Sequence, residues 1–212
     1  ECEASLRRLK TDYIDLYQIH GWDALTRPDE VGAAISRLKK EGKIRWFGVS
    51  NLNVSQIGMY AEYVDVESLQ PMYNMLRRES ETELFPYCLE KRIGVIPWSP
   101  LYSGLLTGKY RPDQKFDDFR AKEPLFQKDA LGHILDGLEE IKPIAEAHNV
   151  TIPQLAIRWV LTHPAVTSAI VGAKKPEHVE TIVAAADDVL PRRDWFKVAN
   201  IMAAAKQKAE AV

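Results

Sequence analysis

The stretch Tyr13-Ile14-Asp15-Leu16-Tyr17-Gln18-Ile19-His20 is the best starting point for the fold. It is rich in aromatic and β-branched residues and a glycine follows it, a pattern that predicts a strand. His20 places one imidazole at the C-terminal end of that strand. In a barrel of parallel strands the chemistry takes place at the C-terminal ends, so His20 is a candidate catalytic residue. A lone histidine is more often structural, and its neighbours decide between the two readings.

The composition is that of an ordinary soluble domain. Of the 212 residues 46% are apolar, 27% are charged, and the net charge of −2 shows no basic surplus. Nucleic acid is therefore not expected as a partner, and neither is a membrane, because no apolar run approaches the ~20 residues that span one. Cys2 and Cys88 form no disulfide framework, which favours a reducing, cytoplasmic location. The scattered histidines lack metal-ligand spacing, so no metal site is expected.

Strand and helix patterns alternate along the chain. We predict strands at residues 13–20, 45–51, 68–74, 95–99 and 165–172, and helices at 1–10, 28–42, 54–63, 83–91, 136–149, 151–163, 176–187 and 193–208. The long polar connection at residues 100–132 is of a length that is usually functional. This alternation predicts an α/β protein with parallel strands in a single domain, residues 1–212. We expect Trp46 and Trp159 in the core, together with an apolar stripe formed by Val179, Ile182, Val183 and Ala186.

Two layouts fit this order of elements, a doubly wound open sheet and part of a (β/α)-barrel. The chain has no G-x-G-x-x-G or P-loop motif, which weakens the nucleotide-binding open sheets. A complete eight-stranded barrel usually needs about 250 residues. Five predicted strands leave a barrel short by about three βα units of roughly 30 residues each. The helical pattern that starts at residue 1 likewise suggests that an upstream part is absent.

Polar and aromatic residues follow every predicted strand. They are His20, Ser50-Asn51, Gln70 with Tyr73 and Asn74, Trp98-Ser99, and Gly172-Ala173-Lys174. The amide and hydroxyl groups could bind the edge of a carboxamide, and Trp98 could stack on a planar ring. The segment before the helix at Pro176 suits a phosphate, with Lys174 or Lys175 adding charge. Together these residues describe a dinucleotide site without a Rossmann fingerprint.

Three ordered motifs carry a specific family resemblance. They are residues 13–20, then Gly42-Lys43-Ile44-Arg45 with Gly48-Val49-Ser50-Asn51, then Trp98-Ser99-Pro100-Leu101 with Leu106-Thr107-Gly108-Lys109-Tyr110. The chain resembles the aldo-keto reductase superfamily over essentially its whole length, in particular the branch of bacterial reductases and potassium-channel β-subunits. The resemblance implies a (β/α)8 TIM barrel, here an incomplete one of about five βα units plus a C-terminal helix. It also implies reduction of a small-molecule aldehyde or ketone by NADP(H).

The resemblance assigns roles to individual residues. His20 matches the active-site histidine that orients the substrate carbonyl and assists proton transfer, and Trp98 matches the aromatic that stacks on the nicotinamide. The other cofactor residues are Ser50, Asn51 and Gln70 for the carboxamide; Ser99, Leu101 and Ser103 for the pyrophosphate side; Lys109 and Arg120 on a cofactor-covering loop, residues 100–132; and Gly172, Lys174 and His178 for the adenosine-phosphate end.

Two departures from the family pattern bear on function. Thr181-Ile182 stands where the family usually has a Glu-Asn pair that binds adenine, so weaker cofactor binding is expected. The Asp, Tyr and Lys of the catalytic tetrad lie upstream of the histidine and have no matching positions here; losing a general acid typically costs ~10²–10⁴-fold in rate. The alternative function is therefore a non-catalytic nucleotide-binding or regulatory fragment.

An incomplete barrel would leave the strands ending at His20 and Gly172 with open edges. Open strand edges invite pairing with another chain. The sequence therefore predicts either self-association or a separate N-terminal fragment that stays bound.

Overall fold

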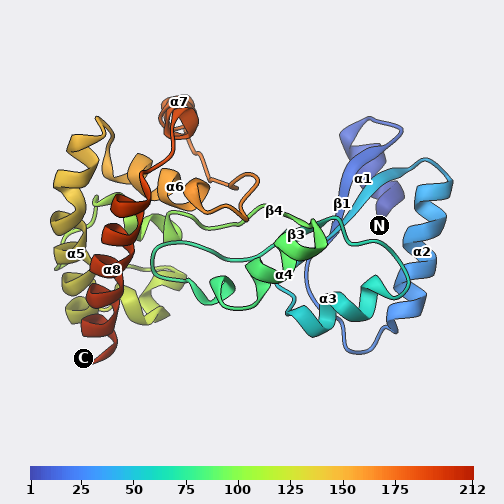
Figure 1. Ribbon diagram of the computed structural model, residues 1–212, viewed down its shortest axis with the longest axis horizontal. Coiled ribbons are helices and arrows are strands. Elements are labelled where there is room, and N and C mark those ends of the chain that lie inside the picture. Colours follow the sequence, from blue (N-terminus) through green and yellow to red (C-terminus); the bar gives the residue numbers. More distant parts are fainter. The chain divides into compact units, whose positions relative to one another are not determined.

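The computed structural model describes all residues, 1–212, and its contacts divide them into two compact units. Unit 1 comprises Glu1–Pro71 and Glu79–Pro97, and unit 2 comprises Met72–Arg78 and Trp98–Val212. All four regular strands belong to unit 1, whereas unit 2 is built from helices and turns (Figure 1). None of the helices combines the length and the hydropathy that crossing a bilayer requires.

Unit 1 contains one parallel sheet whose strands follow chain order. The strands are β1 (Ile14–Ile19), β2 (Ile44–Ser50), β3 (Ser68–Gln70) and β4 (Gly94–Val95). The register pairs Ile19 with Val49 and Ser50 with Gln70, so the C-terminal ends of β1, β2 and β3 meet at one edge. The predicted α/β class with parallel strands is confirmed.

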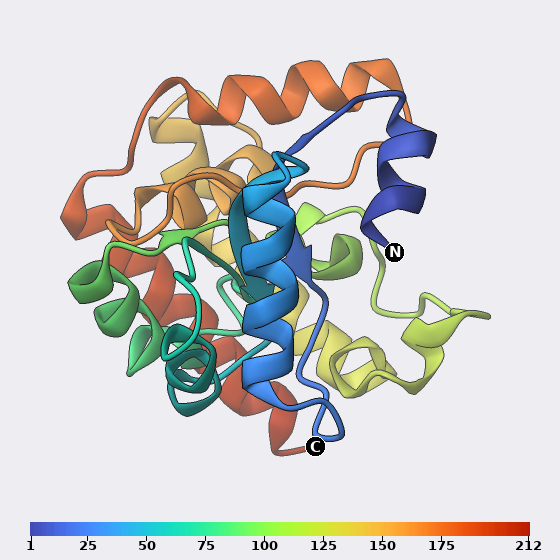
Figure 2. The same cartoon turned by 90° about the vertical axis from the view of Figure 1, so that its right-hand side faces the viewer.

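Helices cover this sheet in the places that the apolar patterns predict. They are α1 (Cys2–Leu9), α2 (Pro28–Lys40), α3 (Val54–Ala61) and α4 (Leu84–Lys91), with a 3₁₀ turn η1 (Glu79–Glu81) before α4. Proline in the first turn of α2 fixes φ where no backbone donor is needed, and two acidic residues there suit the helix dipole. A capping box between Asn53 and Gln56 starts α3. Helix α2 packs on β2 and α3 and lies over the strands in Figure 2.

Unit 2 is organised around two long helices that lie side by side, α5 (Lys128–Ala147) and α8 (Arg192–Glu210) (Figure 1). They approach closely because Gly137 has no side chain; a Cβ there would lie 2.6 Å from the Cβ of Ala205. Helix α6 (Ile152–Thr162) joins α8 through a stacked indole pair. The rings of Trp159 and Trp195 are 4.8 Å apart, and each indole N–H donates to the other residue's carbonyl.

The remaining elements of unit 2 are short. They are α7 (Pro176–Ala184) and the 3₁₀ helices η2 (Tyr102–Thr107), η3 (Phe119–Lys122), η4 (Pro124–Phe126) and η5 (Ala185–Asp187). The fifth predicted strand, 165–172, is reduced to one parallel bridge between Ile170 and Trp98. Helix α5 begins at Lys128, not at the predicted residue 136, because its buried stripe already starts at Ala130 and Leu131.

Two predictions about burial were wrong. Trp46 is 56% exposed, since β2 presents it beside the incompletely buried β1. Helix α7 has no buried residue, and Val179 and Val183 of its expected core stripe are 50% and 61% exposed. Trp159 is fully buried, as predicted.

Candidate functional site

The C-terminal ends of β1, β2 and β3 bring four predicted site residues of unit 1 together. The Ser50 hydroxyl donates to the Gln70 carbonyl at 2.8 Å, and the Asn51 backbone N–H donates to the same oxygen at 3.2 Å. The Asn51 side-chain amide donates to the His20 carbonyl at 3.4 Å. Asn51 adopts a left-handed conformation with φ 57°, which asparagine tolerates better than most residues. The sheet thus fixes the backbone positions of Ser50, Asn51, Gln70 and His20.

The imidazole of His20 lies one residue beyond β1 and is exposed. The structure shows no hydrogen bond or ion pair to either ring nitrogen. In the loop that follows, Asp23 accepts from the Thr26 hydroxyl and the Leu25 N–H, and these bonds hold the pKa of its carboxyl below its usual value. The Asp23 carboxylate is therefore bonded within its own loop and not to His20. The ring nitrogens of His20 are available to a hydrogen-bond acceptor or donor of a ligand.

Gln18 was not predicted as a site residue, yet it positions one. Gln70 Nε2 donates to Gln18 Oε1 at 2.9 Å, and Gln18 Nε2 donates to the Ser68 hydroxyl at 3.4 Å. This chain of amides fixes the orientation of the Gln70 amide and turns its Oε1 away from Gln18. The signal in the sequence is spacing, because Gln18 stands two residues before His20 and so lies on the same face of the strand.

In unit 2 the predicted pyrophosphate residues lie in a turn with left-handed backbone. Ser99 and Ser103 have φ of 60° and 54°, and Gly104 has φ of 89°. Buried Asn74 holds this turn, because its Nδ2 donates to the Ser99 carbonyl at 2.9 Å and its Oδ1 accepts from Leu76 N–H at 2.9 Å. Non-glycine residues in this region cost energy and concentrate at ligand-binding sites. Left-handed turns of this kind present backbone N–H groups to anions.

The predicted residues Trp98 and Leu101 flank the same turn. Trp98 bridges to Met72 and Ile170 through its backbone, and its carbonyl accepts from the Tyr73 N–H at 3.3 Å. The Leu101 carbonyl accepts from Gly104 and Leu106 at 2.9 and 3.2 Å. Leu101 therefore shapes the turn through its backbone.

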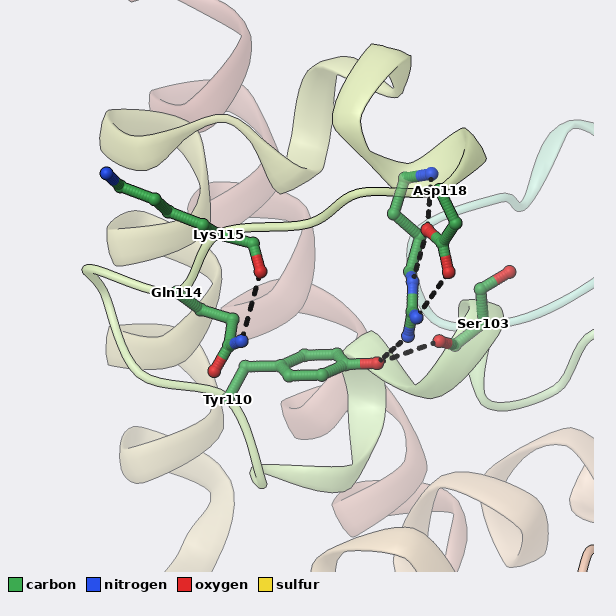
Figure 3. A network of polar contacts seen from close by, with 6 residues as sticks. Ser103, Tyr110, Gln114, Lys115 and Asp118 are labelled. Carbon is green, nitrogen blue, oxygen red and sulfur yellow. Dashed lines mark hydrogen bonds and ion pairs between the residues drawn. The ribbon is translucent and has the colours of Figure 1, made fainter.

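Two cationic residues of the predicted covering loop, Lys109 and Arg120, fold back on this turn. A Cβ at Gly104 would lie 3.0 Å from the Tyr110 hydroxyl and 3.1 Å from Lys109 Nζ, so both groups sit directly over the turn. The Tyr110 hydroxyl donates to the Ser103 carbonyl at 3.2 Å and accepts from Arg120 (Figure 3). Tyr110 was missed at the sequence level because no periodicity marks it.

Asp118 fixes the side chain of Arg120. Arg120 makes two hydrogen bonds of 2.9 and 2.6 Å to the Asp118 carboxylate (Figure 3). The bond from Arg120 is the main reason that the pKa of Asp118 lies below its usual value, and the charge of Lys174 lowers it further. Lys174 is thus near enough to Asp118 to interact with it electrostatically.

The Gly172–Lys175 segment precedes α7 and is exposed. The Lys174 N–H points at His178 Nδ1 at 3.3 Å, and His178 N–H donates to the Lys175 carbonyl at 3.1 Å. The helix N-terminus and the lysine ammonium groups both favour an anion here. Lys174 and His178 are therefore neighbours at the start of α7, and Gly172 lies two residues before Lys174.

The donors of unit 1 and those of unit 2 suit different chemical groups of a nicotinamide dinucleotide. Unit 1 offers amide and hydroxyl groups fixed by a sheet, which suit a neutral carboxamide. Unit 2 offers a left-handed turn under Lys109, the clamped Arg120 and a helix N-terminus beside Lys174, which suit phosphates. Three or more metal-ligating side chains do not cluster anywhere in the structure.

A family model described as the aldo/keto reductase family matches residues 1–203. The chain belongs to the aldo/keto reductase family. It is 38% identical over 189 residues to the NADH-specific methylglyoxal reductase of Escherichia coli (strain K12), a match that covers 87% of this chain and 58% of that protein. It is 36% identical over 185 residues to the aldo-keto reductase YhdN of Bacillus subtilis (strain 168), covering 86% and 56%.

A solved structure with the same fold is a glycerol dehydrogenase from Gluconobacter oxydans. It has a TM-score of 0.92 and 34% sequence identity, and the match covers 96% of this chain and 63% of that one. A probable voltage-gated potassium channel β-subunit from Arabidopsis thaliana is 34% identical over 200 residues, covering 89% of this chain and 61% of that protein. The chain thus spans between 56% and 61% of the length of these curated relatives, and its fold is that of the aldo-keto reductase barrel.

Proposed function

We propose that this chain binds NADP(H) and takes part in the reduction of an aldehyde or ketone to an alcohol. The observation that carries the proposal is the hydrogen-bonded cluster of Ser50, Asn51 and Gln70 beside the exposed His20 at the ends of three parallel strands. Relatives named as reductases and dehydrogenases support the reaction class. A cytoplasmic location is proposed with it, supported by the two unpaired, buried cysteines.

Different residues of unit 1 would bind the cofactor and orient the substrate. Gln70 Oε1 would accept from the carboxamide NH₂, while Gln18 holds that amide in the required orientation. Bound NADP(H) would supply hydride to the carbonyl carbon. His20 would donate a hydrogen bond to the carbonyl oxygen and so hold the substrate in place.

The residues of unit 2 would hold the charged part of the cofactor. Lys109, over the turn at Gly104, and Arg120, bonded to Asp118, would bind pyrophosphate oxygens. Trp98 would stack on the nicotinamide ring. Lys174 at the start of α7 would bind a 2′-phosphate, which is the reason to propose NADP(H) over NAD(H).

The second candidate function is nucleotide binding without catalysis, in a regulatory or interaction protein. The observation in its favour is that no acidic or cationic side chain is bonded to the imidazole of His20. Similarity to a protein named as a probable channel β-subunit also supports it.

The decisive experiment titrates the 212-residue chain with NADPH and with NADH, following tryptophan emission, and then adds 4-nitrobenzaldehyde to measure NADPH oxidation. The reductase proposal predicts quenching by NADPH with a Kd weaker than ~1 µM, a slow turnover, and loss of turnover in His20→Ala. The Lys174→Gln variant should weaken NADPH binding and leave NADH binding unchanged, whereas Lys142→Gln on α5 should change neither. Quenching without turnover supports the second candidate, and no quenching by either nucleotide contradicts both.

A further inference from the structure

The hydroxyl of Tyr110 connects two segments of unit 2 that carry predicted cofactor residues. It donates a hydrogen bond to the Ser103 carbonyl at 3.2 Å, in the left-handed turn, and accepts one from Arg120 Nη1 on the covering loop (Figure 3). The hydroxyl therefore fixes the position of the Arg120 guanidinium relative to the turn.

The guanidinium of Arg120 keeps donors that its own contacts do not use. Nε and Nη2 donate to the two oxygens of Asp118 at 2.9 and 2.6 Å, and Nη1 donates to the Tyr110 hydroxyl. Because arginine has five N–H donors, one N–H on Nη1 and one on Nη2 remain. A phosphate group accepts such a pair of donors from one guanidinium. The Arg120 side chain is 25% exposed, so a ligand can reach it.

The ring of Tyr110 is held by contacts that do not involve its hydroxyl. It packs edge-on against Phe116 at 5.0 Å and against Phe126 at 6.0 Å between ring centroids. Lys109 Nζ lies over the same ring, 5.0 Å from its centroid. A phenylalanine can make all of these contacts. Tyr110→Phe therefore removes two hydrogen bonds and retains the packing.

A second tyrosine hydroxyl holds the same loop without contacting a predicted site residue. Tyr102 is 3% exposed, and its hydroxyl is bonded to Glu123, the residue directly after η3. The same hydroxyl accepts from Arg77 Nη2 at 3.2 Å. The two tyrosines thus attach η3 near its two ends, Tyr110 through Arg120 and Tyr102 through Glu123. Tyr102 is a matched control for Tyr110, because its hydroxyl attaches the loop and acts on neither Lys109 nor Arg120.

We propose that Tyr110 is a positioning residue for the pyrophosphate of the cofactor, an inference that rests on the proposed function. Its hydroxyl and the Asp118 carboxylate hold the Arg120 guanidinium at different nitrogens, so the remaining N–H groups keep one orientation. Donors that are already oriented bind a phosphate with a smaller loss of side-chain entropy. Because the pyrophosphate is common to NADP(H) and NAD(H), the hydroxyl contributes equally to the binding of both.

The test measures the binding of four ligands by calorimetry to the parent chain, to Tyr110→Phe and to Tyr102→Phe. NADPH, NADH and ADP-ribose contain a pyrophosphate, whereas 2′-AMP carries the adenosine and the 2′-phosphate alone. We expect Tyr110→Phe to raise the Kd of each pyrophosphate ligand about fivefold and to leave that of 2′-AMP within about twofold. Tyr102→Phe should lower the urea midpoint of unfolding and leave all four Kd values within about twofold.

A double-variant cycle shows whether the hydroxyl acts through Arg120. Arg120→Ala should weaken NADPH binding by more than Tyr110→Phe does, because it removes the donors themselves. Adding Tyr110→Phe to Arg120→Ala should then raise the Kd by less than about twofold further. A full fivefold loss in the double variant would contradict a role through Arg120.

The outcomes separate this inference from the proposed function. If the parent chain binds NADPH and Tyr110→Phe binds it equally well, Tyr110 has no positioning role. An equal loss for 2′-AMP would point to a general loss of structure, and an equal loss in Tyr102→Phe would show that attachment of the loop is sufficient; either result overturns the inference. A parent chain that binds none of the four ligands overturns the proposed function and the inference with it.

Discussion

The strand-end cluster of unit 1 and the turn-and-loop cluster of unit 2 hold their polar groups in place by different kinds of contact. In unit 1, Ser50 and Asn51 bond to the main chain of Gln70, which belongs to the sheet. In unit 2, Lys109, Tyr110 and Arg120 are held by one another, by Asp118 and by a left-handed turn. The sheet positions the first group without help from side-chain charges. The second group depends on contacts between individual side chains, which are lost when a side chain changes its protonation state or is truncated.

This difference has a consequence for mutation. Single substitutions in unit 2 should damage the cluster more than equivalent ones in unit 1, because no ladder of backbone hydrogen bonds replaces a lost contact.

The largest effect is expected for Asn74→Ala, which removes the buried amide that holds the turn in unit 2. The Leu76 N–H loses its partner, at about 1–3 kcal/mol, and the Ser99 carbonyl keeps only the bond from the Tyr102 N–H. Urea unfolding followed by tryptophan emission should show a loss of about 2–3 kcal/mol. Gln114→Ala, which removes an exposed amide bonded only to the Lys115 carbonyl, is the control and should change stability by less than about 0.5 kcal/mol. Equal losses for the two variants would refute the role of Asn74.

The next effect is expected from the pair Gly104→Ala and Gly108→Ala. Both glycines have positive φ, at 89° and 70°, so each alanine costs about 1–2 kcal/mol in backbone strain. Only the Cβ at position 104 meets neighbours, Tyr110 and Lys109, whereas position 108 has nothing within 4 Å. NADPH affinity measured by fluorescence should fall about tenfold for Gly104→Ala and stay near the parent value for Gly108→Ala. Identical nucleotide affinities would show that Lys109 does not act from its position over the turn.

A smaller effect is expected in unit 1 from Gln18→Leu. Losing the acceptor for Gln70 Nε2 frees the Gln70 amide to rotate, which should cost about 1 kcal/mol of NADPH binding, a fivefold rise in Kd. Gln18→Glu keeps the acceptor oxygen and should bind like the parent chain. If the two variants bind NADPH equally, Gln18 has no positioning role.

The smallest effect is expected at acid pH, in the protection of backbone N–H groups from hydrogen exchange. It distinguishes the two clusters because only the cluster of unit 2 is held by a carboxylate. The pKa of Asp118 is lowered in the folded chain, mainly by Arg120, so its contribution to stability is present above the unfolded pKa of about 3.9 and is lost as pH falls through the folded value. The Arg120 N–H, bonded to Asp118 Oδ1 at 3.0 Å, should lose protection from hydrogen exchange below pH 4. The Asn51 N–H, bonded to a carbonyl, should not. Asp118→Asn should show the weaker Arg120 protection already at pH 6, and unchanged protection there would contradict this assignment.

Much of unit 1 could be predicted from sequence because its signals are local. Alternation in residues 13–20 and a small polar pair at Ser50-Asn51 mark strand ends, and parallel pairing then brings those ends together. The chemistry of the cluster follows from residue types at known positions.

Unit 2 was harder to predict because its contacts are not periodic. The bonds between Tyr110, Ser103 and Arg120 depend on how an irregular segment folds back, which no pattern of spacing encodes. The exposure of Trp46 and of the α7 stripe was missed for a related reason. An apolar residue at the right period predicts a buried face only when another element is present to cover it.

The stacked indoles of Trp159 and Trp195 have an optical consequence. Two rings 4.8 Å apart and inclined by only 4° couple electronically, so they give unit 2 a near-ultraviolet circular dichroism signal that depends on the contact between α6 and α8. Trp46, largely exposed, provides unit 1 with an emission that reports on solvent. Comparing the two signals along one denaturation curve shows whether both units lose structure in a single cooperative transition or in two.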